Sequence, residues 1–412
     1  MGKRKLSVLF VVLVTVIMAF TSFMGEFAKP AAAQVETLKI GFLSDISSPL
    51  GRDCQRLLEA LVDVVNEKNG LVIGSDRYKI ELIVYDSKSS AETGRAAIEK
   101  LIYHDKVKFI LGDPTADAWL PITEENKVVS VVFSPSPACV KPSLKYTFQG
   151  SFLNTAVTVA WGWFSTNYPE LKTIGALLPD DLNGHNDAKL LEKICDVFGL
   201  KKVSIVFYPH GTTDFGAYAT KMKSLNPQIY TTAGSGPPWD ALSLKFLREA
   251  GYEGLFFNYR GLSPEKWAKI VNLNVLKRSI YVIGDIDLES PLSAVSKEAK
   301  AIYIAKYGSW DYPAVPFVGN WYLLKTALEN AQSIDPGKVA AVIGNGLKFD
   351  TPFAPAMMIS RPDLGKTRTI DALYGTHVAT YEGGKTKLIH KISVEEAFGY
   401  IKKSRIFGAY PD

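Results

Sequence analysis

The sequence has few cysteines and lacks the usual catalytic signatures. Its three cysteines, Cys54, Cys139 and Cys195, are scattered along 412 residues, which excludes a disulfide framework and a zinc site. There is no G-x-S-x-G, H-E-x-x-H, C-x-x-C or G-x-x-x-x-G-K-[ST] motif, and the five histidines do not cluster. Because these motifs mark nucleophile elbows, zinc hydrolases, redox centres and phosphate-binding loops, we expect no enzyme activity, no cofactor and no bound metal.

An excess of charge of one sign is also absent. The formal net charge is +5, and the first 33 residues contribute +3 of it through Lys3, Arg4, Lys5 and Lys29 against Glu26, which leaves +2. So small a balance argues against nucleic acid or an anionic membrane as a partner.

Long apolar runs are confined to the N-terminus. A basic start is followed by the apolar stretch Leu6 to Phe20 and by the small residues Ala31 to Ala33, which is the pattern of a secretory signal peptide. The pattern predicts removal of residues 1–33 with cleavage after Ala33; an uncleaved membrane anchor is the alternative. No later stretch has the length and apolarity of a membrane span, so we expect a soluble, exported protein.

Short apolar runs alternate with segments of helical period from Leu38 onward. The first series of expected strands is Leu38 to Leu43, Tyr78 to Tyr85, Val107 to Leu111 and Val128 to Phe133. A second series begins after Asn154 with Ile174 to Leu178, Val203 to Tyr208, Ile229 to Thr232, Leu255 to Tyr259 and Ile280 to Ile283. The alternation indicates an α/β protein of two lobes, each with a doubly wound, mostly parallel sheet.

Open sheets of this kind bind ligands beyond the carboxyl ends of their strands. The loops expected there are Ser44 to Gly51, Gly112 to Asp117, Ser134 to Pro142, Pro179 to His185, Gly234 to Trp239 and Asn258 to Gly261. Asp180 to Gly184 is similar to the start of a calcium loop but lacks the closing glutamate, and it is interpreted as a strand-to-helix turn. Trp119 is interpreted as core or as ligand contact, and Cys54 and Cys139 as buried thiols or as one bridge.

Four short stretches, in their order and spacing, resemble the periplasmic binding proteins of branched-chain amino-acid ABC transporters. They are Ile40 to Ser44, Ser134 to Ala138, Gly211 to Phe215 and Asp335 to Val339. The resemblance runs through nearly all of the mature chain. It implies the type I periplasmic binding protein fold, with two lobes joined by a three-strand hinge. The first lobe would take residues 34–153 and 285–350, and the second 154–284 and 351–412.

The same resemblance implies a ligand site between the lobes. In that family, backbone amides and hydroxyls of two first-lobe loops hold a ligand carboxylate, and the matching positions here are Thr115 and Ala116 and then Ser136, Ala138 and Cys139.

Family members that bind amino acids hold the ammonium with two acids of the second lobe, where this chain has Asn154 and Arg260. Family members have an aromatic residue that closes over the ligand at the position where this chain has Asn183. Trp239 and Tyr259 lie close in sequence to other positions of the cleft. Because a guanidinium attracts a carboxylate and repels an ammonium, we expect an organic anion with an apolar or aromatic body. The alternative is that Arg260 pairs with an acid such as Asp240 or Asp285, or points into solvent.

The resemblance further implies a monomer that closes on a small molecule in the periplasm and presents it to the permease subunits of an ABC transporter. Three other interpretations are open. One is a ligand-sensing module for a chemoreceptor or regulator, another is an amino-acid or amide-binding protein, and the last is a secreted hydrolase with unrecognised residues.

Overall fold

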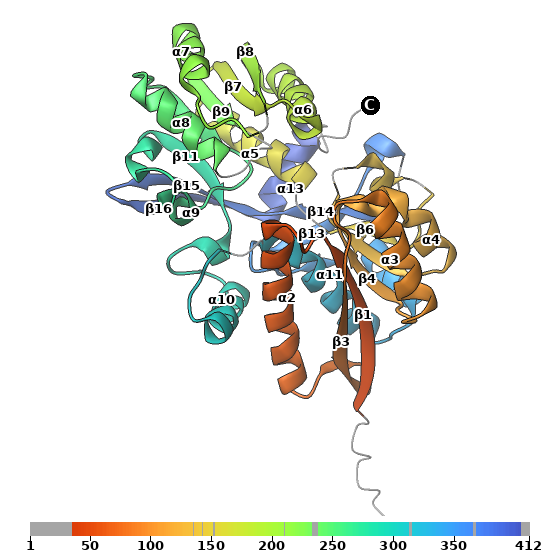
Figure 1. Ribbon diagram of the computed structural model, residues 1–412. Helices are drawn as coiled ribbons and strands as arrows, with labels where there is room; N and C mark the ends of the chain where they lie inside the picture. The colour runs from red at the N-terminus through yellow and green to blue at the C-terminus, as the bar shows by residue number, and fades with distance from the viewer. Residues whose placement is uncertain are drawn as a thin grey trace, which may run out of the picture.

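The computed structural model describes residues 35–134, 136–141, 143–150, 153–209, 211–232, 238–312, 315–365 and 368–404. Two separate sheets, each accompanied by helices, form two lobes (Figure 1). Each of the nine strands expected from apolar runs lies within one observed strand, give or take two residues at its ends. The α/β class and the two-lobe architecture are therefore confirmed.

The first sheet has nine strands in the order β12-β13-β14-β6-β5-β4-β1-β3-β2. From β14 to β3 all neighbours are parallel, whereas β2, β12 and β13 pair antiparallel. The central strands are buried on both faces, which explains their unbroken apolar sequences. The strands are β1 (Val35–Ser44), β2 (Leu71–Ile73), β3 (Asp76–Asp86), β4 (Phe109–Gly112), β5 (Val129–Val132), β6 (Thr147–Gln149), β12 (Lys348–Phe349), β13 (Ala356–Ser360) and β14 (Thr369–Tyr374).

Several helices of this lobe begin at capping side chains. Ser48 accepts a hydrogen bond from the Gly51 amide at the start of α2, and Ser90 and Asp335 do the same for α3 and α12. The apolar side chains of α2, among them Leu57, Leu58 and Leu61, are buried in the same core cluster as Cys54. The helices are α2 (Pro49–Glu67), α3 (Ala91–Tyr103), α4 (Leu120–Glu125), α10 (Ala294–Tyr307), α11 (Val315–Ala331) and α12 (Pro336–Gly344).

The second sheet has seven strands in the order β16-β15-β11-β10-β9-β7-β8. Its strands are β7 (Thr173–Pro179), β8 (Lys201–Tyr208), β9 (Ile229–Thr232), β10 (Leu255–Asn258), β11 (Ser279–Ile283), β15 (Thr376–Glu382) and β16 (Lys385–Ile392). The accompanying helices are α5 (Leu153–Asn167), α6 (Leu182–Phe198), α7 (Gly216–Leu225), α8 (Trp239–Glu249), α9 (Pro264–Ala268) and α13 (Val394–Ser404). Asp181 caps α6 by accepting from the Gly184 amide at 2.8 Å, as the turn interpretation of this segment predicts.

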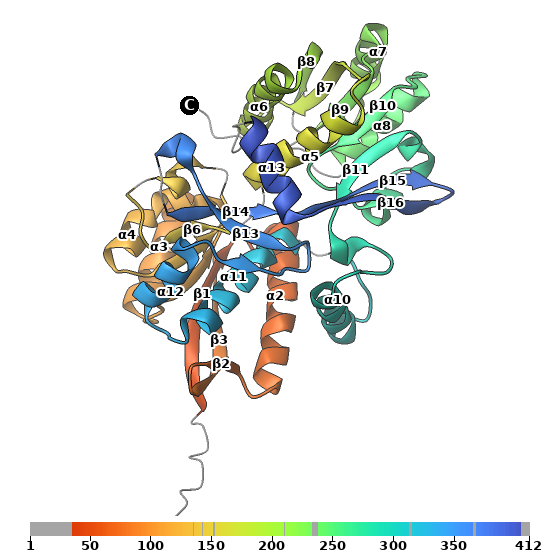
Figure 2. The ribbon, with the colours of Figure 1, turned by 180° about the vertical axis from the view of Figure 1, so that it is seen from behind.

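The chain passes between the two sheets three times: after β6, after β11, and at Gly375 between β14 and β15. Seen from behind, β14 continues into the β15–β16 ribbon of the second lobe (Figure 2). We expected everything from Thr351 onward to join the second lobe, but β13 and β14 belong to the first sheet. The reason is pairing: β14 lies parallel beside β6, with Asp371 opposite Gln149, and β13 pairs with β14.

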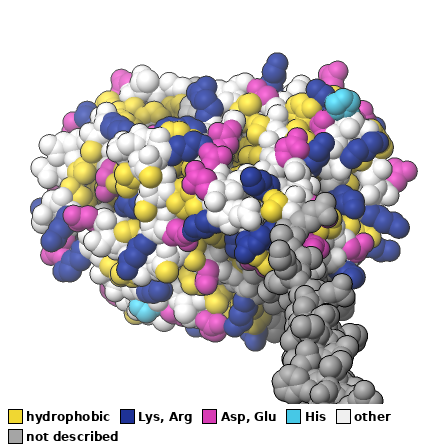
Figure 3. All heavy atoms as spheres, turned by 90° about the horizontal axis from the view of Figure 1, so that it is seen from below, with side chains coloured by type: hydrophobic (Ala, Val, Ile, Leu, Met, Phe, Trp, Pro, Cys, Tyr) yellow, Lys and Arg dark blue, Asp and Glu magenta, His cyan; other side chains and the backbone are white. Residues whose placement is uncertain are grey.

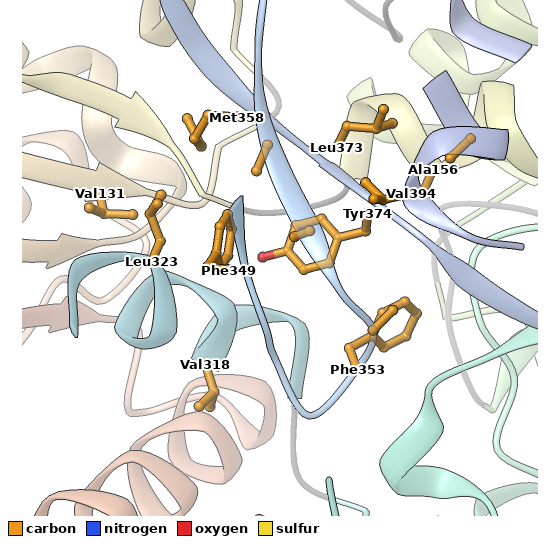
Figure 4. Packing of buried hydrophobic residues seen from close by; sticks show 14 of the residues in the cluster. Val131, Ala156, Val318, Leu323, Phe349, Phe353, Met358, Leu373, Tyr374 and Val394 are labelled. Carbon is orange, nitrogen blue, oxygen red and sulfur yellow. The ribbon is translucent and has the colours of Figure 1, made fainter. Parts of the chain in front are cut away.

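Apolar packing continues through the region where the chain crosses. Tyr374, the last residue of β14, has its ring centroid 6.0 Å from that of Phe349 and 6.4 Å from that of Phe353 (Figure 4). Its hydroxyl donates to the carbonyl oxygen of Gly150 at 2.6 Å. The segment that leaves β6 and the segment that leaves β14 are therefore held together.

Basic and acidic side chains alternate over the surface seen from below (Figure 3). This mixture agrees with the small net charge. Over the described ranges, no helix is long and apolar enough to cross a membrane.

Candidate functional site

The expected site residues lie at or just beyond the carboxyl ends of parallel strands in both lobes. Thr115 and Ala116 follow β4, Ser136 to Cys139 follow β5, and Arg260 follows β10. Asn154 lies in the first turn of α5 and Asn183 in that of α6, but their side chains are outside the part of the chain that the structure describes. The expected roles of these two residues stay predictions.

The hydrogen-bond donors of Thr115 are used inside the first lobe. Its amide and its hydroxyl both donate to Asp113 Oδ1, at 2.9 and 2.6 Å, and its hydroxyl also accepts from the Trp119 indole at 3.2 Å. Ala116 is fully buried, and its amide donates to the carbonyl oxygen of Asp113. The expectation that these two residues offer free donors to a ligand is therefore not met in this conformation.

Asp113 takes these donors because it caps the short 3-10 turn Pro114–Ala118. The Ser87 hydroxyl donates to its other oxygen. Burial raises the pKa of Asp113, although the hydrogen bonds from Ser87 and Thr115 act in the opposite direction. The side chain of Trp119 is buried in the core of the first lobe. Its indole nitrogen donates to Thr115 of this turn.

The second first-lobe loop surrounds an aspartate that sequence reasoning did not single out. The Ser136 hydroxyl donates to Asp117 Oδ2 at 2.5 Å, and the Cys139 thiol lies 3.7 Å from Asp117 Oδ1. The Ala138 amide donates to Ser136 Oγ at 3.1 Å. Asp117 itself is exposed. The two loops together therefore present the Asp117 carboxylate to solvent, where we had expected donors for a ligand anion.

Cys139 is fully buried, and it is a free thiol, as are Cys54 and Cys195. Cys54 belongs to a different core cluster from Cys139. The bridge considered between Cys54 and Cys139 is therefore not formed.

Arg260 forms an ion pair with Asp187 of α6. The alternative that Arg260 pairs with an acid is therefore what the structure shows, although the acid is neither Asp240 nor Asp285. The Asp187 side chain is 1% exposed and that of Arg260 is 24% exposed. Burial lowers the pKa of Arg260 to about 10, so the guanidinium stays charged at neutral pH. Within the described residues, Arg260 Nε and Asp187 Oδ2 have no hydrogen-bond partner. The pair therefore leaves polar atoms of both side chains unsatisfied.

Tyr259 points into the core of the second lobe. Its ring is fully buried against Trp161, with centroids 5.6 Å apart, and near Phe257. The expectation that its ring covers a ligand is therefore not met in this conformation. Its hydroxyl and the Trp161 indole nitrogen are buried without a partner in the described part of the chain.

Trp239 is the first residue of α8, and its half-buried ring packs against the second-lobe core. Residues 233–237 of the preceding loop lie outside the described residues. The contact of Trp239 with a ligand therefore stays a prediction.

Comparison with known proteins gives a family match over most of the chain. Residues 37–379 match the sequence model of a family described as periplasmic binding protein. The match covers well over half of the chain, from β1 into β15, and it includes all three crossings between the sheets.

Solved structures share this fold at low sequence identity. A branched-chain amino-acid ABC transporter periplasmic ligand-binding protein of Burkholderia xenovorans LB400 is 17% identical with a TM-score of 0.70, covering 90% of this chain and 99% of that one. A leucine-binding protein of Thermotoga maritima MSB8 is 20% identical with a TM-score of 0.67, covering 87% and 100%. An ABC transporter solute-binding protein of Rhodopseudomonas palustris HaA2, in complex with p-hydroxybenzoic acid, is 20% identical with a TM-score of 0.68, covering 89% and 100%.

Proposed function

The chain belongs to the periplasmic binding protein family, and from this premise we propose that it binds a small organic solute between its two lobes and delivers it to the permease of an ABC transporter. The lobes must both contact the solute, because only a ligand that favours the closed arrangement can shift the equilibrium toward it. The protein would act as a monomer, without a cofactor.

Arg260 is the observation that carries the proposed ligand class. Its guanidinium is charged, partly exposed and held at the end of β10 by Asp187. A guanidinium has five N–H donors, so one bond to Asp187 leaves others for a second carboxylate. We infer that the solute carries a carboxylate that binds Arg260.

The opposite end of the solute would meet Asp117 and Ser136 in the first lobe. A carboxylate and a hydroxyl oxygen there accept hydrogen bonds, so they favour a donor on the ligand and repel a second anion. A hydroxylated carboxylate with an aromatic or apolar body satisfies both ends. The p-hydroxybenzoic acid bound by the Rhodopseudomonas palustris protein has this chemistry.

Asp117 also favours a second candidate, an amino acid bound with its carboxylate at Arg260 and its ammonium at Asp117. This orientation is the reverse of the one expected from the family pattern. The Thermotoga maritima protein, described as leucine-binding, shows that the fold also serves such ligands. The two candidates differ in the group that faces Asp117, a neutral hydroxyl or an ammonium.

A thermal-shift screen separates the two ligand classes. The purified protein would be heated with 4-hydroxybenzoate, benzoate, leucine and leucinamide. A ligand at about 100 times its Kd should stabilise the fold by about 2.7 kcal/mol. Stabilisation by 4-hydroxybenzoate supports the proposed class, stabilisation by leucine supports the second candidate, and stabilisation by leucinamide alone would count against both because it has no carboxylate.

Substitution of Arg260 tests the residue itself. Arg260→Ala should weaken binding of a carboxylate by about 2–5 kcal/mol, the scale for removing one partner of a buried charge pair. Arg95→Ala is the matched control, because Arg95 lies on the exposed face of α3 and its ion pair among the described residues is with Glu99, four residues on. Equal affinities of the two variants for the carboxylate would show that Arg260 does not bind the ligand.

Export is part of the proposal. Cleavage after Ala33 would give a mature protein that begins at Gln34 in the periplasm. Mass spectrometry of periplasmic material should give the mass of residues 34–412, and a retained apolar segment would contradict the cleavage site.

We also propose that the protein does not change its solute chemically. Incubation with 4-hydroxybenzoate followed by chromatography should return the solute intact, and a new product would indicate an enzyme.

Transport and sensing differ in the protein that binds the loaded form. Capture of a permease subunit by the loaded protein would favour transport, and capture of a chemoreceptor would favour sensing.

A further inference from the structure

Two of the three crossings between the lobes lie side by side and are joined by a histidine and an aspartate. His377 is the second residue after Gly375, and Asp285 is the first after Gly284. In the sheet, His377 lies opposite Ile283, the last residue of β11. The imidazole Nε2 is 3.5 Å from Asp285 Oδ1.

Asp285 is anchored to first-lobe elements. Its backbone amide donates to the carbonyl oxygen of Phe353 at 2.7 Å, in the segment that leads into β13. Its carboxylate accepts from the amides of Leu292 and Ser293, each at 2.9 Å, at the start of α10. Because α10 packs against α2, Asp285 follows the first lobe when the lobes move.

His377 is anchored to the second lobe. Its strand, β15, pairs with β11 on one side and with β16 on the other. The contact between His377 and Asp285 therefore spans the pivot, and a change in the angle between the lobes must change its geometry.

The imidazole is held in its neutral form here. Its side chain is 1% exposed, and among the described residues neither ring nitrogen has a hydrogen-bond partner. Burial lowers the pKa of His377; Asp285 acts to raise it, and Lys391 on β16 lowers it further. Hydrogen bonds from Ser296, Leu292 and Ser293 outweigh burial and lower the pKa of Asp285, which stays charged.

His377 lines a pocket of about 300 Å³ between β12 and the start of α13. The other charged groups around this pocket are Lys348, Asp350, Lys391 and Glu395, and Lys348 pairs with Glu395 at 3.2 Å. These opposite charges balance, so Asp285 and Lys391 are the groups that act most directly on the ring.

We propose that His377 makes the hinge sensitive to protons, so that its protonation disfavours the lobe arrangement seen here and shifts the protein toward arrangements that solvate the ring or bring it closer to Asp285. The physical basis is linkage: a state that binds a proton more weakly loses population as the pH falls. A histidine in water has a pKa of about 6.5, so the shift belongs below that pH. The inference goes beyond the proposed ligand and holds for any solute.

The first measurement uses the unaltered protein without ligand. Histidine ring resonances would be followed by NMR from pH 8 to pH 4.5, and His377 should titrate below about 6.5, the pKa of a histidine in water. A pKa of His377 at or above that value would overturn the proposal.

The second measurement follows the lobes. Dyes on Ala96→Cys in α3 and Lys221→Cys in α7, two exposed positions in different lobes, would report their separation by energy transfer. The transfer efficiency should change with pH at the midpoint found for His377. The change should persist in His104→Gln and disappear in His377→Gln.

The same pH profile in both variants, or no pH-dependent change in the parent protein, would overturn the proposal. If His377→Gln does not fold, the ring titration and the pH profile of the unaltered protein still decide, because their midpoints must coincide. Neither measurement includes a solute, so failure here leaves the ligand screen untouched.

Discussion

Arg260 and Asp187 are neighbours in space although 73 positions separate them along the chain, and each leaves one polar atom of the pair unsatisfied among the described residues. This arrangement fixes the guanidinium at the end of β10 without exhausting its donors. It also predicts how substitution of Asp187 changes the stability of the protein.

Asp187→Asn should destabilise the fold by about 3 kcal/mol, at the lower end of the range for a broken buried ion pair because Arg260 is partly exposed. A carboxylate ligand should then restore the lost counter-charge and raise the Tm by more in the variant than in the parent protein. Urea unfolding and thermal shift would measure the two effects. Asp180→Asn is the control, since Asp180 is exposed and, in the described part of the chain, its side chain pairs with His185. An equal effect of both substitutions would contradict the prediction.

Gly375 should not tolerate a side chain. A Cβ at this position would lie 2.7 Å from the carbonyl oxygen of Ile392, a backbone atom that cannot move aside freely. Gly375→Ala should therefore cost about 1–3 kcal/mol, the scale of overpacking. Gly399→Ala in α13 should instead stabilise by about 0.5–1 kcal/mol, because no described residue lies within 4 Å of the added methyl group and alanine favours helix. Chemical unfolding of both variants would show shifts of opposite sign.

All three thiols should be unreactive until the protein unfolds. Burial raises the pKa of Cys139 to about 12 and that of Cys195 to about 11, and it raises the pKa of Cys54 as well. Since the thiolate is the reactive form, an Ellman titration at pH 8 should be slow on the native protein and should count three thiols in denaturant. A count of one would mean that a bridge exists.

Ionisation of the Asp287 carboxyl should lower the free energy of unfolding as the pH rises. Burial raises its pKa to about 7, with Lys266 acting against this and Glu265 reinforcing it. The folded protein therefore keeps a proton that the unfolded chain releases near pH 4, and stability is lost between about pH 4 and 7. Asp287→Asn should unfold at higher urea than the parent at pH 7.5 and show little difference at pH 4.5. An equal difference at both values would contradict the raised pKa.

The strands were predictable because burial on both faces leaves an unbroken apolar run. Phe109 to Leu111 and Val129 to Val132 show this directly in the sequence. The tail was not predictable in the same way, because β14 is placed by pairing with β6, a strand of three residues that has no pattern of its own.

The site shows a similar limit. The positions of Arg260, Ser136 and Thr115 after strands followed from topology. What their donors contact did not. Ser136 and Arg260 are engaged by Asp117 and Asp187, which lie in other segments of the chain, and Thr115 is engaged by Asp113 through the turn that Asp113 caps. Local sequence therefore predicts the position of a side chain in the fold better than it predicts the hydrogen-bond partner of that side chain.

The pairing of β14 with β6 also bears on how the protein folds. Asp371 and Gln149 meet from distant parts of the chain, so β6 remains an unpaired edge until almost all of the polypeptide is present. Contacts between distant segments slow folding, and an open edge invites other chains to add to it. A nascent or truncated chain that stops before β14 would therefore be the form most exposed to aggregation, and the first sheet can be completed only after strands β7 to β11 of the second lobe have been synthesised.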